Sequence, residues 1–207
     1  MANYSGAWPV IPTPYDQHLM IDCGVYQTLI EWYIQHNVGG LYANCLSSEM
    51  YALTPTERLL LVSETAKASK GRVPVAATGN FGPDLAADAV FCREVARSGA
   101  DVVMLVIPEY LPNDAALGDY LFRLADLVDA PLGLYECPVP RHYHLGIELV
   151  RKLAQSGRFV AFKETSCVLE KIRAMIEVTR GTPLAYLQAN TPYLLEATRL
   201  GAPGTMS

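Results

Sequence analysis

The chain has 207 residues, of which 51% are hydrophobic and 18% charged, and its net charge is −5. This composition is typical of a folded, core-rich protein and excludes a disordered chain. Lys and Arg form no cluster, so we expect no nucleic-acid partner, because contacts with a phosphate backbone require grouped basic side chains. No apolar run reaches the roughly 18–20 residues of a membrane span, and scattered cysteines favour a reducing compartment. We therefore expect a cytoplasmic protein without a membrane segment.

Short apolar segments alternate with amphipathic helical segments along the chain. The apolar, strand-like segments begin near Trp8, Gly39, Val73, Asp101, Leu132, Phe159, Pro183 and Gly204. The predicted helical segments span residues 22–35, 54–69, 84–98, 114–128, 145–155, 167–179 and 191–200. The second helical segment begins with Thr54-Pro55-Thr56-Glu57. This start combines a threonine cap, a proline at the first helical position and a glutamate three residues after the cap.

Eight strands that alternate with helices predict parallel βαβ units. We predict an α/β fold, a (β/α)8 TIM barrel, formed by a single domain of residues 1–207. The alternative is an open, doubly wound sheet, but no Gly-x-Gly-x-x-Gly follows the first strand, so a dinucleotide cofactor has no support. The sequence stops at Ser207, on the eighth predicted strand. We therefore expect a truncated form that lacks the final helix and a C-terminal helical region.

In such a barrel the active site lies at the carboxyl ends of the strands. The side chains expected there are Thr13, Ser47, Ser48, Glu49, Thr78, Asn80, Glu109, Tyr110, Tyr135, Glu136, Cys137, Lys163, Glu164, Thr165, Asn190 and Ser207. Hydroxyl groups, tyrosines and a single lysine in this set suit a small polar anion as ligand.

Lys163 ends an apolar strand and is the only lysine of five at a strand's carboxyl end. Partial loss of hydration there disfavours the ammonium and makes a neutral, nucleophilic amine accessible. The alternative is a lysine that merely ends a strand and reaches solvent. Tyr135 ends the neighbouring strand and either moves protons near this amine or caps the core. We expect the remaining lysines to lie on solvated helix faces or just after helices, at Lys67, Lys70, Lys152 and Lys171.

The other candidate groups have weaker support as functional residues. His142 and His144 with Cys137 fit no standard zinc spacing, so we expect solvated histidines and no metal. Cys45 and Cys137 have no evident histidine base, which favours buried thiols over nucleophiles. Arg141 lies six residues after Tyr135 and either clamps a substrate carboxylate or stays at the surface. We expect no cofactor.

An ordered set of segments resembles the dihydrodipicolinate synthase / N-acetylneuraminate lyase family of class I, pyruvate-handling (β/α)8 aldolases. The segments cover essentially the whole chain and are 9–14, 53–58, 71–75, 99–101, 108–110, 134–138, 162–165 and 201–207. The resemblance implies a lyase in which Lys163 forms a Schiff base with a 2-oxo acid such as pyruvate and Tyr135 relays protons. It implies that Tyr110 reaches a neighbouring subunit's site, within a homodimer or homotetramer. We assign substrate binding to Thr13, Ser47, Ser48, Arg141 and Met206.

One segment departs from the family pattern. Where the family has Gly-Thr/Ser-Thr-Gly-Glu, which holds the pyruvate carboxylate, this chain has Cys45-Leu46-Ser47-Ser48-Glu49. Glycine permits backbone angles and close ligand approach that other residues restrict, so we expect a reshaped or lost carboxylate cradle. Pro140 replaces the synthase arginine, which argues against aspartate semialdehyde as the second substrate. The alternative functions are a non-catalytic or regulatory barrel that binds a small ligand and, more distantly, a metal-dependent aldolase.

Overall fold

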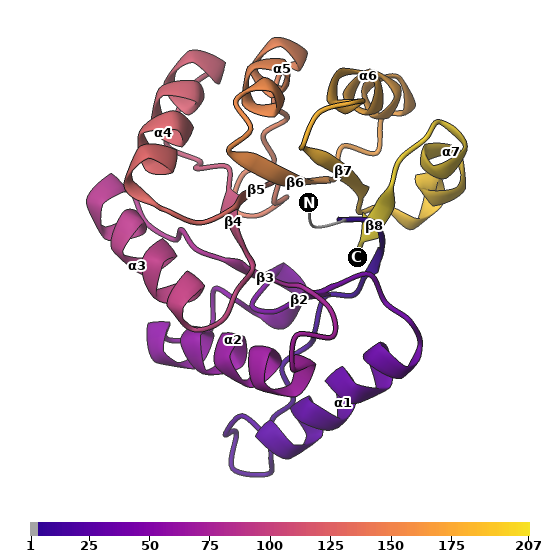
Figure 1. The fold of residues 1–207 in the computed structure, drawn as a ribbon. Coiled ribbons are helices and arrows are strands. Elements are labelled where there is room, and N and C mark those ends of the chain that lie inside the picture. The colour runs from indigo at the N-terminus through magenta and orange to yellow at the C-terminus, as the bar shows by residue number, and fades with distance from the viewer. Residues whose placement is uncertain (1–3) are drawn as a thin grey trace.

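The computed structural model describes residues 4–207, and within them strands alternate with helices around a ring (Figure 1). The strands are β1 (Gly6–Trp8), β2 (Leu41–Tyr42), β3 (Val75–Thr78), β4 (Val102–Val106), β5 (Leu132–Tyr135), β6 (Phe159–Glu164), β7 (Ala185–Gln188) and β8 (Gly204–Met206). The helices are α1 (Cys23–Gln35), α2 (Pro55–Ser69), α3 (Leu85–Arg97), α4 (Asp114–Leu127), α5 (Ile147–Gln155), α6 (Leu169–Thr179) and α7 (Leu194–Arg199). Two short 3-10 helices, η1 (Leu46–Ser48) and η2 (Thr191–Tyr193), lie in loops. Residues 1–3 of the predicted domain lie outside the described residues.

All paired strands are parallel, and neighbours follow the order β1-β8-β7-β6-β5-β4-β3-β2. The two outer strands of this order meet through a bridge between Val10 and Tyr42. The amide of Ile11 donates to the carbonyl of Tyr42 over 2.9 Å, and the amide of Tyr42 donates to the carbonyl of Pro9 over 3.0 Å. The sheet therefore closes into a barrel with the helices outside it (Figure 1). The predicted (β/α)8 fold is confirmed, and the open sheet is wrong.

Local signals position the helices. Thr54 Oγ1 accepts a hydrogen bond from the amide of Glu57, and the Glu57 carboxylate accepts from the amide of Thr54, so the predicted capping box is present. Two predicted helices begin two residues later than expected, at Ile147 and Leu169. The amide of Leu145 is instead bonded to the Glu136 carboxylate, and Cys167 has a φ of 55°, which no right-handed helix accommodates.

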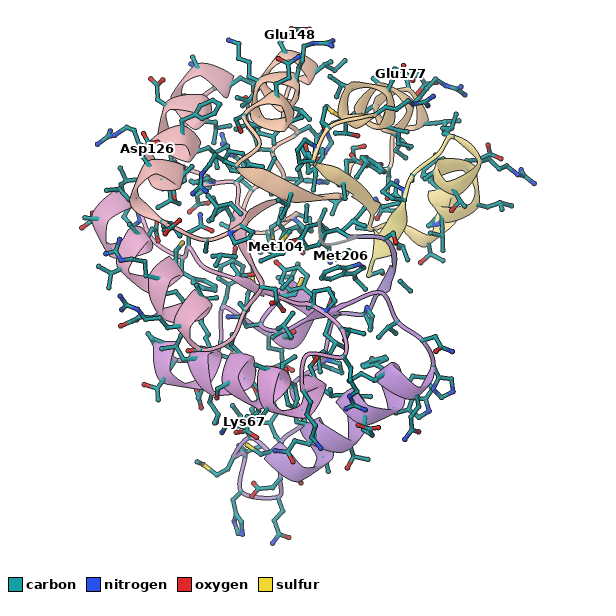
Figure 2. All side chains as sticks on the ribbon, in the orientation of Figure 1. Lys67, Met104, Asp126, Glu148, Glu177 and Met206 are labelled. Carbon is teal, nitrogen blue, oxygen red and sulfur yellow. The ribbon has the colours of Figure 1, made fainter. Side chains whose placement is uncertain are left out.

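The strands separate two apolar layers. Alternate side chains of a strand face opposite sides, so Phe162 packs between sheet and helices while Ala161 faces the barrel interior. Met104 and Met206 lie inside the ring of strands, whereas Lys67 and Glu148 project outward from helices (Figure 2). The same alternation turns Lys163, two residues after Ala161, toward the interior.

Among residues 4–207, none of the helices has the length and apolarity needed to cross a lipid bilayer.

Candidate active site

Lys163 lies on β6 beside Tyr135 of β5, its partner in the strand register. Its side chain is 5% exposed, so the alternative of a lysine that reaches solvent is wrong. The Nζ atom lies 4.9 Å from the centroid of the Tyr135 ring and 5.4 Å from that of Tyr42. It donates to the Sγ atom of Cys45 over 3.5 Å. Within the described chain this amine forms an ion pair with no carboxylate.

Two tyrosines hold their protons in this environment. Burial, with a further contribution from the nearby Cys45, raises the pKa of both Tyr135 and Tyr42 well above the ordinary value. The Tyr42 hydroxyl is 2.9 Å from Thr78 Oγ1. Both phenols are therefore neutral hydrogen-bond donors at neutral pH. Tyr42 was not among the site residues that we predicted from the sequence. It lies two residues after Gly40 on a buried strand, at a position that faces the barrel interior.

The loop after β2 is held by hydrogen bonds from Ser48 and from Thr13, which lies in the segment after β1. Ser48 Oγ accepts from the amide of Cys45 over 3.1 Å and donates to the carbonyl of Ile11 over 2.5 Å. Thr13 Oγ1 donates to the carbonyl of Ser48 over 2.7 Å. The hydroxyls of Thr13 and Ser48, which we predicted to bind substrate, are thus engaged with the main chain. In this structure they position the loop.

The absence of the family's glycines does not distort this loop. Cys45 has φ −94° and ψ −178°, an extended conformation open to any residue, and only Glu49 adopts the left-handed region, with φ 60°. In residues 4–207 the amides of Leu46 and Ser47 donate to no protein acceptor, and the Ser47 side chain is exposed. Two main-chain donors and one hydroxyl therefore remain available to an anionic ligand.

The other predicted site residues form no hydrogen bond with Lys163 among the described residues. Arg141 Nη2 donates to the carbonyls of Pro108 and Leu111, over 3.3 and 2.8 Å, so its guanidinium fastens two loops together. Met206 is fully buried in the barrel interior. Tyr110 is 43% exposed. It lines a largely apolar cavity of about 250 Å³ whose walls include Tyr51, Phe81, Pro108, Glu109 and Pro140, but not Lys163.

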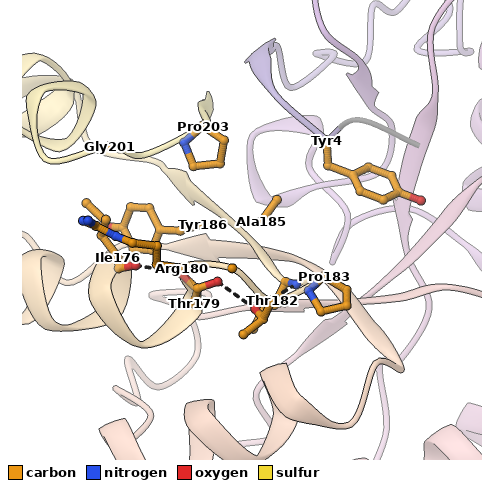
Figure 3. Close-up of a pocket in the computed structure, with 12 residues that line it drawn as sticks. Tyr4, Ile176, Thr179, Arg180, Thr182, Pro183, Ala185, Tyr186, Gly201 and Pro203 are labelled. Carbon is orange, nitrogen blue, oxygen red and sulfur yellow. Dashed lines mark hydrogen bonds between the residues drawn. The ribbon is translucent and has the colours of Figure 1, made fainter. Parts of the chain in front are cut away.

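A second cavity, of about 310 Å³, lies at the opposite end of the barrel. Its walls include Tyr4, Arg180 and Pro203, next to the amino-terminal ends of β1, β7 and β8 (Figure 3). Lys163 stands at the carboxyl end of β6, so this cavity is remote from the candidate amine.

A buried charge cluster lies behind the candidate amine, between the sheet and α6. Lys171 Nζ is 2.7 Å from Glu136 Oε1 and 3.9 Å from Glu164 Oε1. The Lys171 side chain is 14% exposed and both glutamates are fully buried. Our expectation of a solvated Lys171 is therefore wrong. Glu136 and Glu164 follow the inward-facing Tyr135 and Lys163 and so face outward, where α6 covers them and supplies the cation that they require.

Burial raises the pKa of Glu136 from its ordinary value of 4.5 to about 7, although Lys171 opposes this change. Between these values the folded chain binds a proton at Glu136 that the unfolded chain has released. The free energy of unfolding should therefore fall as the pH rises through this window. Urea denaturation across the window measures the slope, and Glu136→Gln should flatten it. An equal slope in the variant and the natural chain would contradict this prediction.

His142 and His144 are exposed, as expected. His142 Nε2 lies 2.7 Å from Thr165 Oγ1 and 3.1 Å from His144 Nε2. In the part of the chain that the structure describes, no group of three or more His, Cys, Asp or Glu side chains could hold a metal ion.

Comparisons with known proteins agree with this arrangement. Residues 3–207 match the model of the dihydrodipicolinate synthetase family. The 4-hydroxy-tetrahydrodipicolinate synthase of Oceanobacillus iheyensis is 30% identical over 206 residues, which are 99% of this chain and 69% of that protein. The enzyme of the same name from Methanoculleus marisnigri is 30% identical over 208 residues, 99% of this chain and 70% of that protein.

Solved structures show the same fold. The dihydrodipicolinate synthase of Thermotoga maritima has a TM-score of 0.92 at 20% identity, covering 99% of this chain and 70% of that one. YagE, a prophage protein of E. coli K12 in the same family, was solved in complex with pyruvate. Its TM-score is 0.90 at 25% identity, with the same coverage of both chains. The family match over nearly the whole sequence, together with the barrel and the lysine at the end of β6, confirms the resemblance: this chain belongs to the dihydrodipicolinate synthetase family.

Proposed function

We propose that this chain is a class I lyase that acts on a 2-oxo acid such as pyruvate through a Schiff base on Lys163. One observation carries the proposal. Lys163 is buried at the carboxyl end of a barrel strand, has no carboxylate partner within residues 4–207 and lies against Tyr135. An amine in such a place is available as a nucleophile. The pyruvate complex of the related YagE supports this substrate class.

In the proposed reaction, Lys163 Nζ adds to the ketone carbon of the 2-oxo acid and forms a carbinolamine. Loss of water then gives an iminium ion, which withdraws electrons from the adjacent carbon. A carbon–carbon bond at that carbon can form or break, or water can leave from the substrate. Tyr135, whose raised pKa keeps its hydroxyl protonated, donates to the ketone oxygen as the carbinolamine forms and takes up a proton from the added nitrogen.

We assign the substrate carboxylate to the loop after β2. The free amides of Leu46 and Ser47 and the exposed Ser47 hydroxyl are suitable donors. Thr13 and Ser48 act on the substrate indirectly in this proposal, since their hydroxyls hold the loop. Met206 belongs to the buried cluster inside the barrel that also contains Tyr135. This division of roles replaces the direct substrate contacts that we predicted for these three residues.

The aldol partner is less constrained than the 2-oxo acid. Arg141 is engaged with the carbonyls of Pro108 and Leu111, and Pro140 stands where the synthases have their arginine. Both observations argue against a second carboxylate in the partner and so against aspartate semialdehyde. Tyr110 is exposed near the strand ends, which supports a role at a subunit boundary in a cytoplasmic homodimer or homotetramer. Light scattering on the purified protein would measure this assembly.

Borohydride trapping tests the proposal. Incubation with pyruvate and sodium borohydride should convert the Schiff base into a stable secondary amine on Lys163. Intact-mass and peptide mass spectrometry should then show one reduced adduct per chain, located in the peptide that contains β6. A chain that gives no adduct with pyruvate or with a series of other 2-oxo acids would refute the lyase and favour the non-catalytic binder.

A further inference from the structure

The thiol of Cys45 is the hydrogen-bond partner of the candidate amine among the described residues. Its Sγ atom accepts a hydrogen bond from Lys163 Nζ over 3.5 Å, although 118 residues separate the two in the sequence. Cys45 is fully buried and packs in the same barrel cluster as Tyr42 and Tyr135. A thiol at this place is a departure from the glycine of the family pattern, so family membership does not account for it.

The loop fixes the direction of this thiol. The amide of Cys45 is bonded to Ser48 Oγ, and its carbonyl accepts from the amides of Ser48 and Met50. On the preceding residue, the Asn44 side chain pairs with the main chain of Thr78 in both directions, over 2.7 and 3.3 Å. The backbone on both sides of the thiol is therefore tied down. The contact between Sγ and Nζ follows from this framework and not from a free rotation of an exposed side chain.

The site needs a proton carrier that Tyr135 alone does not supply. Lys163 has to lose a proton before it attacks the ketone, and a proton has to reach the oxygen that leaves. Tyr135 holds its proton because burial raises its pKa, so it is a poor acceptor for the proton of the ammonium. A thiol is intrinsically a stronger acid than a phenol or an ammonium, and its conjugate thiolate is compatible with a neighbouring cation.

We propose that Cys45 is a catalytic residue that exchanges a proton with Lys163 as the Schiff base forms and breaks. This inference rests on the function proposed above. The Cys45 thiolate accepts a proton from the Lys163 ammonium and leaves a neutral amine. The amine adds to the ketone, and Tyr135 relays a proton from the added nitrogen to the oxygen, which gives the neutral carbinolamine. The thiol then donates its proton to the carbinolamine hydroxyl, and water leaves. The products are an iminium ion and a thiolate beside it, so protons and charge balance, and the ion pair stabilises the iminium. Hydrolysis of the Schiff base reverses these steps.

The test compares the rate of adduct formation with pyruvate, by timed borohydride quenching across a range of pH, in the natural chain, Cys45→Ala and Cys45→Ser. We expect Cys45→Ala to slow adduct formation on the order of 10²-fold and to reach the same final adduct on Lys163. The pH dependence of the rate should differ from that of the natural chain in both variants. Cys45→Ser retains a polar side chain of similar size and carries the comparison if Cys45→Ala folds poorly. Cys23→Ser, which changes a thiol on α1, should match the natural chain.

The outcomes separate the two proposals. Rates and pH profiles in Cys45→Ala and Cys45→Ser that equal those of the natural chain would overturn the role of Cys45 and leave the lyase intact. A slower rate with an unchanged pH profile would also overturn it, because that result reflects packing around Lys163 alone. A natural chain that forms no adduct at all would remove both proposals.

Discussion

Substituting Lys163 by arginine is expected to eliminate the borohydride-trapped pyruvate adduct and to lower turnover on the order of 10⁴-fold or more. Arginine keeps the positive charge but remains protonated at any accessible pH, so it supplies no nucleophile. Exchange of the pyruvate methyl protons with deuterium in D2O, followed by NMR, reports the enamine directly. This assay requires no knowledge of the aldol partner, and it therefore tests the half-reaction that the site supports best.

The matched control for this experiment is Lys152→Arg. Lys152 lies on α5 with an exposed side chain, so the same chemical change there should leave exchange and trapping unaltered. Because Lys163 is only 5% exposed, the longer arginine could disturb packing. Lys163→Met is a second variant that removes the amine without adding bulk. Adduct formation or methyl exchange that persists in both variants would show that another group carries the chemistry.

Lys171→Met should destabilise the fold by about 3–5 kcal/mol at a pH well above 7. The substitution leaves the carboxylates of Glu136 and Glu164 fully buried without their cation. A change of this size corresponds to a fall in melting temperature of roughly 6–20 °C for a chain of this length. The loss should shrink well below pH 7, because burial raises the pKa of Glu136 to about 7 and the carboxyl is then neutral with or without Lys171. Urea and thermal unfolding well above and well below pH 7 measure the loss of stability and its dependence on pH.

Lys67→Met provides the control at equal geometry. Lys67 Nζ lies 2.7 Å from Glu64 Oε1, the same distance as in the pair of Lys171 with Glu136, but the Lys67 side chain is 68% exposed. The Glu64 side chain is 9% exposed, but it keeps a second donor in Gln27 and solvent reaches the Lys67 ammonium, so removal of this pair should cost clearly less than the loss in Lys171→Met. Equal losses in the two variants, or a loss in Lys171→Met that does not depend on pH, would show that burial does not govern the charge cluster.

The sequence by itself determined the architecture of this protein. Caps such as Thr54 with Glu57, and the alternation of apolar strands with amphipathic helices, are local signals, and each depends on residues within one turn or one strand. Lys163 could be singled out in the same way. An apolar run ends at this residue, and the other four lysines fall on or next to helices. The ordered family segments then gave the amine a chemical role.

Tertiary structure alone decided what surrounds that amine. Cys45 contacts Lys163 although 118 residues separate them in the sequence. The Tyr42 ring, from β2, lies near the Lys163 amine. The hydroxyls of Thr13 and Ser48 donate to main-chain carbonyls and not to a ligand. The position of Lys171 on its helix predicts a surface residue, yet it pairs with two buried carboxylates, Glu136 just after β5 and Glu164 on β6, and is only 14% exposed. Periodicity gives the side of an element on which a residue lies. It does not give the partner on that side, because partners come from strands that only the closure of the barrel brings together.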